Sequence, residues 1–255
     1  MMSNSYHPEK YWSEVSELIK QRNDDNVIAG DDEPYYRYKR NRFLEMLSTI
    51  DFNNKNVLEV GCGPGGNLIE VLKKNPKNLQ AVDISENMVK LATKNTLGKV
   101  AIHKINGTKF PFDDKTFDII FTATVLQHNT DEQMLTQLIA EICRVSTNRV
   151  CIFERVDSKI KGDELCLGRP VSYYENIFKS NNFELVEKEF INIRVSYLIC
   201  GAIRKIFNSS NRTEGQPITK FSVFLQNVTL PISKVLDKIF KSKSDLTKLV
   251  FVRTN

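Results

Sequence analysis

Residues 56–66 read NVLEVGCGPGG, and this stretch decides the fold. The apolar residues of 56–60 predict a short buried strand, and residues 66–75 directly after the glycines have the apolar spacing of a helix. Glycines allow a tight turn and let a ligand approach the main chain closely. The N-terminus of the following helix offers free N–H groups to the same ligand. The stretch therefore predicts a strand, a ligand-binding loop and a helix.

Strands and helices alternate along most of the remaining chain. Parallel βαβ units in a three-layer α/β fold follow from such an order. Ser85 is expected to cap one helix, and Thr130 with Gln133 and Ser172 with Glu175 fit capping boxes. Helices are predicted at 8–22, 35–50, 85–95, 131–145 and 172–180, and strands at 79–83, 99–105, 117–123, 149–154, 183–193 and 247–254.

A long insertion separates the last two predicted strands. Residues 194–246 are far too many for a turn between neighbouring strands. Their apolar residues follow helical spacing, and Pro231 is expected to divide the pattern into two helices. The chain is therefore expected to have N-terminal helices over 1–50, a core over 51–193 and 247–255, and a helical insertion.

The insertion carries much of the positive charge of the chain. Residues 190–255 hold 11 Lys and Arg against 3 Asp and Glu, whereas residues 1–189 hold 25 against 28. A basic segment favours anionic partners. We expect the insertion to cap the acceptor site, to pack on a second subunit in a homodimer, or to dock on an anionic membrane.

The overall composition is that of an ordinary globular protein, with 41% hydrophobic and 26% charged residues. No apolar run approaches the roughly 18 residues that span a bilayer, and residues 1–30 are too charged for a signal peptide. The interpretation is a cytoplasmic protein. The five cysteines show no C-x-x-C spacing and have no histidines nearby, so neither a disulfide framework nor a metal site is expected.

The glycine loop fits two kinds of nucleotide ligand. Gly61, Gly63 and Gly66 satisfy the G-x-G-x-x-G pattern of dinucleotide-binding proteins, and Asp83 would bind a ribose in either case. Glu59 would repel a pyrophosphate but attract an ammonium or sulfonium group. A nucleoside with a cationic tail is therefore expected, and S-adenosylmethionine fits that description.

Several segments carry a family resemblance. VLEVGCGPGGNL, AVDISENMVKLA and INGTKFPFDDKTFDIIFTATVLQH, followed by EICRV, resemble the successive motifs of class I S-adenosylmethionine-dependent methyltransferases that modify small molecules. The resemblance covers about residues 35–193. It implies a Rossmann-like fold whose seven-stranded sheet is mostly parallel, with an antiparallel last strand.

The resemblance also implies roles for individual residues. Glu59, Gly61, Gly63 and Gly65 would line the amino-acid end of the cofactor, Asp83 would bind both ribose hydroxyls, Ile84 and Met88 would flank the adenine, Asn106 and Gly107 would meet its edge, and Ala123 and Thr124 would approach the methionine moiety through their carbonyls. The family most often has Asp at the position of Asn106, so retained but weaker binding is expected.

Two further features each allow two interpretations. His128 follows a strand at the catalytic edge of the sheet, where it is either a general base or a packing residue that bonds a backbone carbonyl. Tyr38 and Arg42 share a helix face that either closes over the cofactor carboxylate or is solvated.

The expected reaction is direct, in-line methyl transfer to an oxygen or nitrogen of a small metabolite, sugar or natural product. A lipid-linked or membrane-associated molecule, or RNA, is an alternative acceptor. Nucleic acid is disfavoured because no N-P-P-Y signature is present. Two different classes of protein also fit the glycine loop: a catalytically inactive scaffold that keeps the cofactor pocket, and a dinucleotide oxidoreductase, which Glu59 disfavours.

Overall fold

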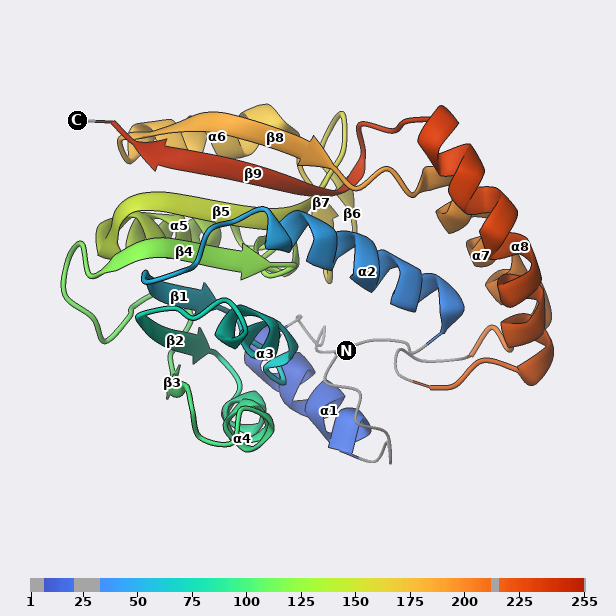
Figure 1. Ribbon diagram of the computed structural model, residues 1–255, viewed down its shortest axis with the longest axis horizontal. Helices are drawn as coiled ribbons and strands as arrows, with labels where there is room; N and C mark the ends of the chain where they lie inside the picture. Colours follow the sequence, from blue (N-terminus) through green and yellow to red (C-terminus); the bar gives the residue numbers. More distant parts are fainter. Residues whose placement is uncertain (1–6, 21–32, 212–215, 255) are drawn as a thin grey trace, which may run out of the picture.

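The computed structural model describes residues 7–20, 33–211 and 216–254. A seven-stranded sheet forms the middle layer (Figure 1), with the strand order β3-β2-β1-β4-β5-β9-β8. Strand β9 runs antiparallel to both β5 and β8, and the other neighbours are parallel. The predicted three-layer α/β fold with an antiparallel last strand is confirmed.

The elements follow the predicted order with small changes at their ends. A short hairpin, formed by β6 and β7, was not predicted. The strands are β1 (Asn56–Val60), β2 (Asn78–Asp83), β3 (Ala101–Lys104), β4 (Phe117–Ala123), β5 (Ser146–Val156), β6 (Lys161–Gly162), β7 (Leu167–Gly168), β8 (Phe183–Phe190) and β9 (Asp245–Arg253). The helices are α1 (Pro8–Lys20), α2 (Pro34–Ser48), α3 (Gly66–Leu72), α4 (Glu86–Asn95), the 3₁₀ turn η1 (Leu126–His128), α5 (Glu132–Val145), α6 (Val171–Ser180), α7 (Arg194–Phe207) and α8 (Lys220–Ile239).

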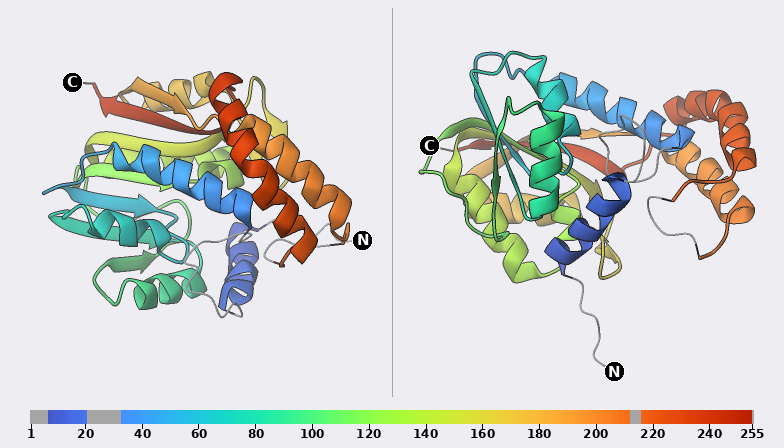
Figure 2. Two further views of the ribbon diagram at one scale, coloured as in Figure 1. Left: turned by 45° about the vertical axis from the view of Figure 1, so that its right-hand side comes forward. Right: turned by 90° about the horizontal axis from the view of Figure 1, so that it is seen from below.

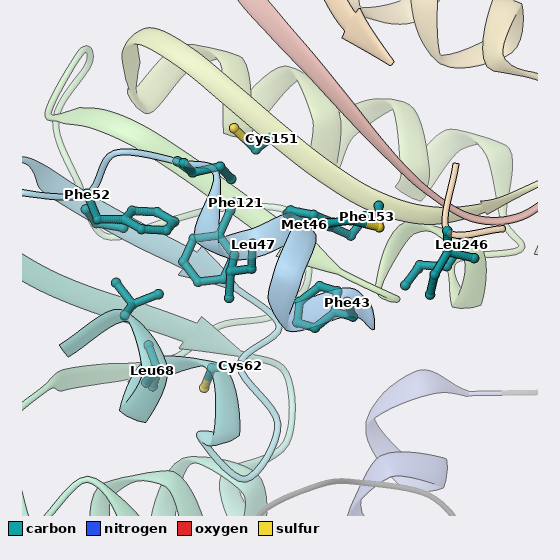
Figure 3. Close-up of a cluster of buried hydrophobic side chains, with 14 of the residues drawn as sticks. Phe43, Met46, Leu47, Phe52, Cys62, Leu68, Phe121, Cys151, Phe153 and Leu246 are labelled. Atoms are coloured by element: carbon teal, nitrogen blue, oxygen red, sulfur yellow. The ribbon is translucent and has the colours of Figure 1, made fainter. Parts of the chain in front are cut away.

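Helices lie on both faces of the sheet (Figure 2), and an apolar core fills the space between the sheet and the helices on each face. Helices α5 and α6 cover one face, and α2 and α3 cover the other. In the second core, Phe43 of α2 meets Phe153 of β5 with ring centroids 5.0 Å apart (Figure 3). This contact fixes the position of α2 across the carboxyl ends of the strands, which is where the site forms.

Both predicted capping boxes were wrong. Asp131 caps α5 by accepting the Met134 N–H at 2.8 Å, because the Thr130 hydroxyl instead donates to the Glu164 carbonyl. The residue before α6 is Pro170, whose extended backbone starts the helix at Val171 without a side-chain cap. The Ser85 cap is confirmed, since its hydroxyl accepts the Met88 N–H.

The insertion between β8 and β9 is a pair of helices, but the division lies elsewhere than expected. Pro231 lies inside α8, which is continuous from Lys220 to Ile239. Pro231 and Asn227 are both exposed, so solvent can hydrate the Asn227 carbonyl that proline leaves without a helical donor. The break between the helices falls after Phe207 instead.

Candidate active site

The glycine loop brings β1 against the end of β2. Gly61 has φ of 72° and donates its N–H to the Val82 carbonyl at 2.8 Å. A Cβ at Gly61 would lie 2.3 Å from Val125 Cγ2, so no side chain fits. Gly63 also has positive φ, but a Cβ there would meet no atom within 4 Å. The loop is therefore tight on one side and open at Gly63.

Asp83 closes this loop from the end of β2. Its Oδ2 accepts the Gly63 N–H at 2.8 Å, and its Oδ1 accepts the Ser85 N–H at 2.9 Å. Burial raises the pKa of Asp83 to about 6, against the opposing effect of these hydrogen bonds. Both carboxylate oxygens are thus held by backbone N–H groups, one from the glycine loop and one from the turn after β2.

A cavity of about 430 Å³ opens beside Asp83 at the carboxyl ends of β1, β2 and β4. Ligands of open α/β sheets bind at this edge. Nine of the residues predicted for the site line the cavity: Gly61, Gly63, Asp83, Ile84, Met88, Gly107, Ala123, Thr124 and His128. That these residues hold a cofactor stays a prediction, but the fold does bring them together.

Glu59 lies behind the cavity wall rather than in it. The side chain is fully buried, and its Oε1 accepts from Asn67 Nδ2 at 2.7 Å. Asn67 Oδ1 in turn accepts from the Arg40 guanidinium, and both Asn67 and Arg40 line the cavity. Burial raises the pKa of Glu59 to about 8. Glu59 therefore acts on the site through an amide that positions a cation.

Four other residues predicted for the site lie outside the cavity lining. Tyr38 and Arg42 do not line the cavity: the Tyr38 hydroxyl donates to Asp237 of α8, and Arg42 pairs with Glu45 in solvent. The face of α2 that reaches the site carries Arg37 and Arg40 instead, together with Tyr36, Lys39 and Phe43. The three-residue spacing of Arg37 and Arg40 was the sequence signal for this face of α2. Nothing in the local sequence distinguished this face from the adjacent face that carries Tyr38 and Arg42.

Gly65 and Asn106 also fall outside the cavity lining. Gly65 is needed because α4 packs against it, where a Cβ would lie 3.2 Å from Ala92 Cα. Asn106 Oδ1 accepts the N–H groups of Thr108 and Lys109, both at 3.2 Å. This is the turn role typical of an Asn-Gly pair, and of the two residues only the neighbouring Gly107 lines the cavity.

His128 lines the cavity with both ring nitrogens engaged. Nδ1 lies 2.8 Å from the Leu165 carbonyl, which can only accept, so Nδ1 carries the proton in the neutral ring. Nε2 lies 3.2 Å from Gln127 Nε2, while Gln127 Oε1 accepts the Arg155 N–H. Gln127 therefore donates to the lone pair that a general base would use. This geometry favours the packing interpretation of His128.

Glu154 builds the turn that carries His128, and the sequence pattern gave no sign of it. Its carboxylate is fully buried at the end of β5 and accepts the N–H groups of Val125, Leu126 and Gln127 at 3.0–3.1 Å. Burial raises the pKa of Glu154 to about 7. A buried carboxylate thus caps η1 and fixes the cavity wall.

Helix α1 covers the other side of the cavity. Pro8 and Trp12 line it, and the Trp12 ring meets the His128 ring edge to face, with centroids 5.1 Å apart. Val15 and Ile19 pack on Met88. Helix α1 therefore places an aromatic ring of the N-terminal segment directly against the cavity.

Comparison with known proteins addresses the fold and the site together. A family profile described as a methyltransferase domain matches residues 57–148. Ajmaline N-methyltransferase from Rauvolfia serpentina is 28% identical over 115 residues, which make up 43% of this chain and 38% of that protein. The match thus spans well under half the length of this curated relative.

Solved structures resemble nearly the whole chain. The [4+2]-cyclase SpnF superposes with a TM-score of 0.64 at 15% identity, covering 96% of this chain and 95% of its own. Magnesium protoporphyrin IX methyltransferase from Synechocystis PCC 6803, solved with bound S-adenosylmethionine, gives 0.61 at 11% identity and the same coverages. At these identities the likeness shows the fold alone.

These findings and the site define the class of protein. Residues 57–148 form a methyltransferase domain with the class I fold, as the resemblance predicted. In the described parts of the chain no helix is long and apolar enough to cross a membrane.

Proposed function

We propose that this protein transfers the methyl group of S-adenosylmethionine directly to a nitrogen or oxygen of a small molecule. The observation that carries the proposal is the cavity that Asp83 and the glycine loop line together with Trp12 and His128. In this proposal the nucleoside binds beside Asp83, and the acceptor binds beside Trp12 of α1 and His128 of η1.

The residues present fit the cofactor. Glu59 Oε2 is buried without a hydrogen-bond partner among the described residues, and the space beside Gly63 is open. Arg40, which lines the cavity, would hold the carboxylate of the cofactor's amino-acid tail. The bound cofactor supplies an electrophilic methyl group on a sulfonium centre. The chain has to orient the acceptor in line with it and exclude water.

The lining of the cavity favours an amine acceptor over a hydroxyl. Asp83 is the only carboxylate among the described residues that line it, and Asp83 is used by the loop. The other candidate base, His128, receives a hydrogen bond from Gln127 at Nε2. A neutral amine brings its own lone pair, whereas a hydroxyl needs a base in the transition state.

Two measurements test the proposal. Thermal-shift titration with S-adenosylhomocysteine, NAD and FAD should show stabilisation by the first ligand alone. Incubation with methyl-labelled S-adenosylmethionine and a small-molecule extract of the source cells should then give a labelled product, identified by mass spectrometry. Binding of S-adenosylhomocysteine without any labelled product would favour the inactive scaffold, and stabilisation by NAD or FAD would favour an oxidoreductase.

A further inference from the structure

Helix α8 turns a mostly polar face toward the protein, whereas a usual surface helix turns its apolar face inward. Its buried residues are Ser222, Gln226, Leu230, Ser233 and Asp237, four of them polar. A surface helix of a globular protein normally turns its apolar stripe toward the core. Here hydrogen bonds, rather than apolar burial, hold the inward face.

Those hydrogen bonds fix the orientation firmly. Gln226 accepts the Tyr35 N–H at 3.0 Å and donates to Glu33 at 2.6 Å. Asp237 accepts the N–H groups of Val195 and Ser196 at the start of α7, at 2.8 and 3.2 Å. Turning α8 over would leave these buried groups without partners, so the outward face is a property of the fold.

The outward face of α8 is apolar. It consists of six side chains that are each 54–67% exposed, and we call it the outer face: Phe221, Phe224, Val228, Ile232, Val235 and Ile239. The 3- and 4-residue spacing places these residues on one stripe of the helix. A contiguous exposed apolar stripe of this kind marks an interaction surface.

Positive charge borders the outer face. Lys220, Lys234 and Lys238 form a row along one flank of α8, and all three are exposed. Among the described residues of 194–243 there is no exposed acidic side chain, and further exposed basic residues are Arg194, Lys205, Lys241 and Lys243. An apolar stripe beside lysines that reach past it is the pattern of a helix lying in a membrane interface.

We propose that the α7–α8 pair docks the protein on an anionic bilayer, with the outer face entering the headgroup region and the lysines contacting lipid phosphates and carboxylates. A second copy of the chain fits this surface less well, because two such faces would bring like charges together. The helices stand beyond the edge of the sheet toward which the parallel strands point (Figure 1), which is the edge that holds the cavity. The proposal does not depend on the identity of the methyl acceptor.

Vesicle binding tests the proposal directly. The intact protein should float with phosphatidylcholine vesicles that contain phosphatidylserine, and much less with pure phosphatidylcholine. High salt should release it, because screening weakens the lysine contacts. Recovery of no protein with the anionic vesicles at low salt would overturn the proposal.

Two variants separate the apolar and charged contributions. Phe224→Gln with Ile232→Gln should abolish flotation, with Leu97→Gln and Ile160→Gln as the control pair, since both control residues are exposed outside α8. Lys220→Gln with Lys238→Gln should weaken partitioning by about fivefold per lysine. Lys94→Gln with Lys99→Gln is the matched charge control, and its partitioning should not change.

Two parallel measurements control for misfolding and for self-association. Affinity for S-adenosylhomocysteine should be the same in all these variants, which shows that they are folded and keeps this result separate from the methyl-transfer proposal. Light scattering should give a monomer. A dimer that Phe224→Gln with Ile232→Gln dissociates, together with no vesicle binding, would assign the outer face to a second copy and refute the membrane proposal.

Discussion

Asp83 Oδ2 accepts a hydrogen bond from the backbone N–H of Gly63 across 2.8 Å. This bond joins the end of β2 to the loop after β1, so the glycine motif and the acidic residue act as one structural unit. The carboxylate both shapes the loop and faces the cavity.

Replacing Asp83 should therefore affect ligand binding as well as stability. We expect Asp83→Ala to weaken S-adenosylhomocysteine binding by about 1–3 kcal/mol, or roughly tenfold to more than a hundredfold, measured by calorimetry. Asp118→Ala is the matched control, because Asp118 also accepts a backbone N–H, from Asn56 at 2.8 Å, but lies outside the cavity lining. Equal affinities for the two variants would refute the assignment of Asp83.

Burial of Glu59 predicts a pH dependence of stability. Its pKa is raised to about 8, so the folded state favours the protonated form. Protonated Glu59 therefore contributes to the free energy of unfolding at acid pH. This contribution is lost as pH rises toward 8, by at most about 1.4 kcal/mol per pH unit.

Glu59→Gln should remove this loss. Its stability relative to the wild type should increase between pH 5 and about 8 in denaturant unfolding, within the window set by the raised pKa. Glu175→Gln, at an exposed position, should run parallel to the wild type. Parallel curves for Glu59→Gln as well would mean that Glu59 is already ionised in the folded protein.

The two arginines of α2 should differ in their effect on the cofactor. Arg40→Gln should lower the affinity for S-adenosylhomocysteine by roughly tenfold or more, because a charge-assisted contact at the cavity is lost. Arg42→Gln should leave it unchanged, since Arg42 pairs with Glu45 away from the cavity. If calorimetry showed a larger loss of affinity for Arg42→Gln than for Arg40→Gln, the cofactor would contact the helix face of Tyr38 and Arg42 instead.

Gly61 should tolerate no side chain. Gly61→Ala combines a positive φ of 72° with a close approach to Val125, whereas Gly98→Ala has a φ of 68° and no atom within 4 Å of its Cβ. Both should lose about 1–3 kcal/mol of stability from backbone strain. Gly61→Ala should lose a further 1–3 kcal/mol or so from overpacking. If chemical denaturation showed equal losses of stability for the two variants, the Val125 side chain would have moved to make room for the added methyl group.

His128 should behave as a positioning residue. Long-range ¹H–¹⁵N spectra should show the Nδ1–H tautomer, held by the Leu165 carbonyl. Once an acceptor is known, His128→Ala should reduce kcat by less than tenfold. A fall of roughly 10²–10⁴ with intact cofactor affinity would instead identify a general base.

The sequence by itself determined the order of the elements and the cluster of Gly61, Gly63, Asp83, Ala123 and Thr124, and the family resemblance implied the antiparallel last strand. Local apolar periodicity sets the type of each element, and parallel strands place their carboxyl ends at one edge. Residues at the ends of predicted strands are therefore brought together by any fold of this class.

Only the tertiary structure decided which way the helices face. The sequence pattern of α2 did not separate Arg40 from Arg42, and the apolar stripe of α8 gave no warning that Gln226 and Asp237 would hold its polar face inward. The role of Glu154 likewise depends on N–H groups from a turn almost thirty residues earlier in the chain. Helix orientation depends on partners distant in sequence, because a buried polar group is stable only where another element supplies its hydrogen bonds.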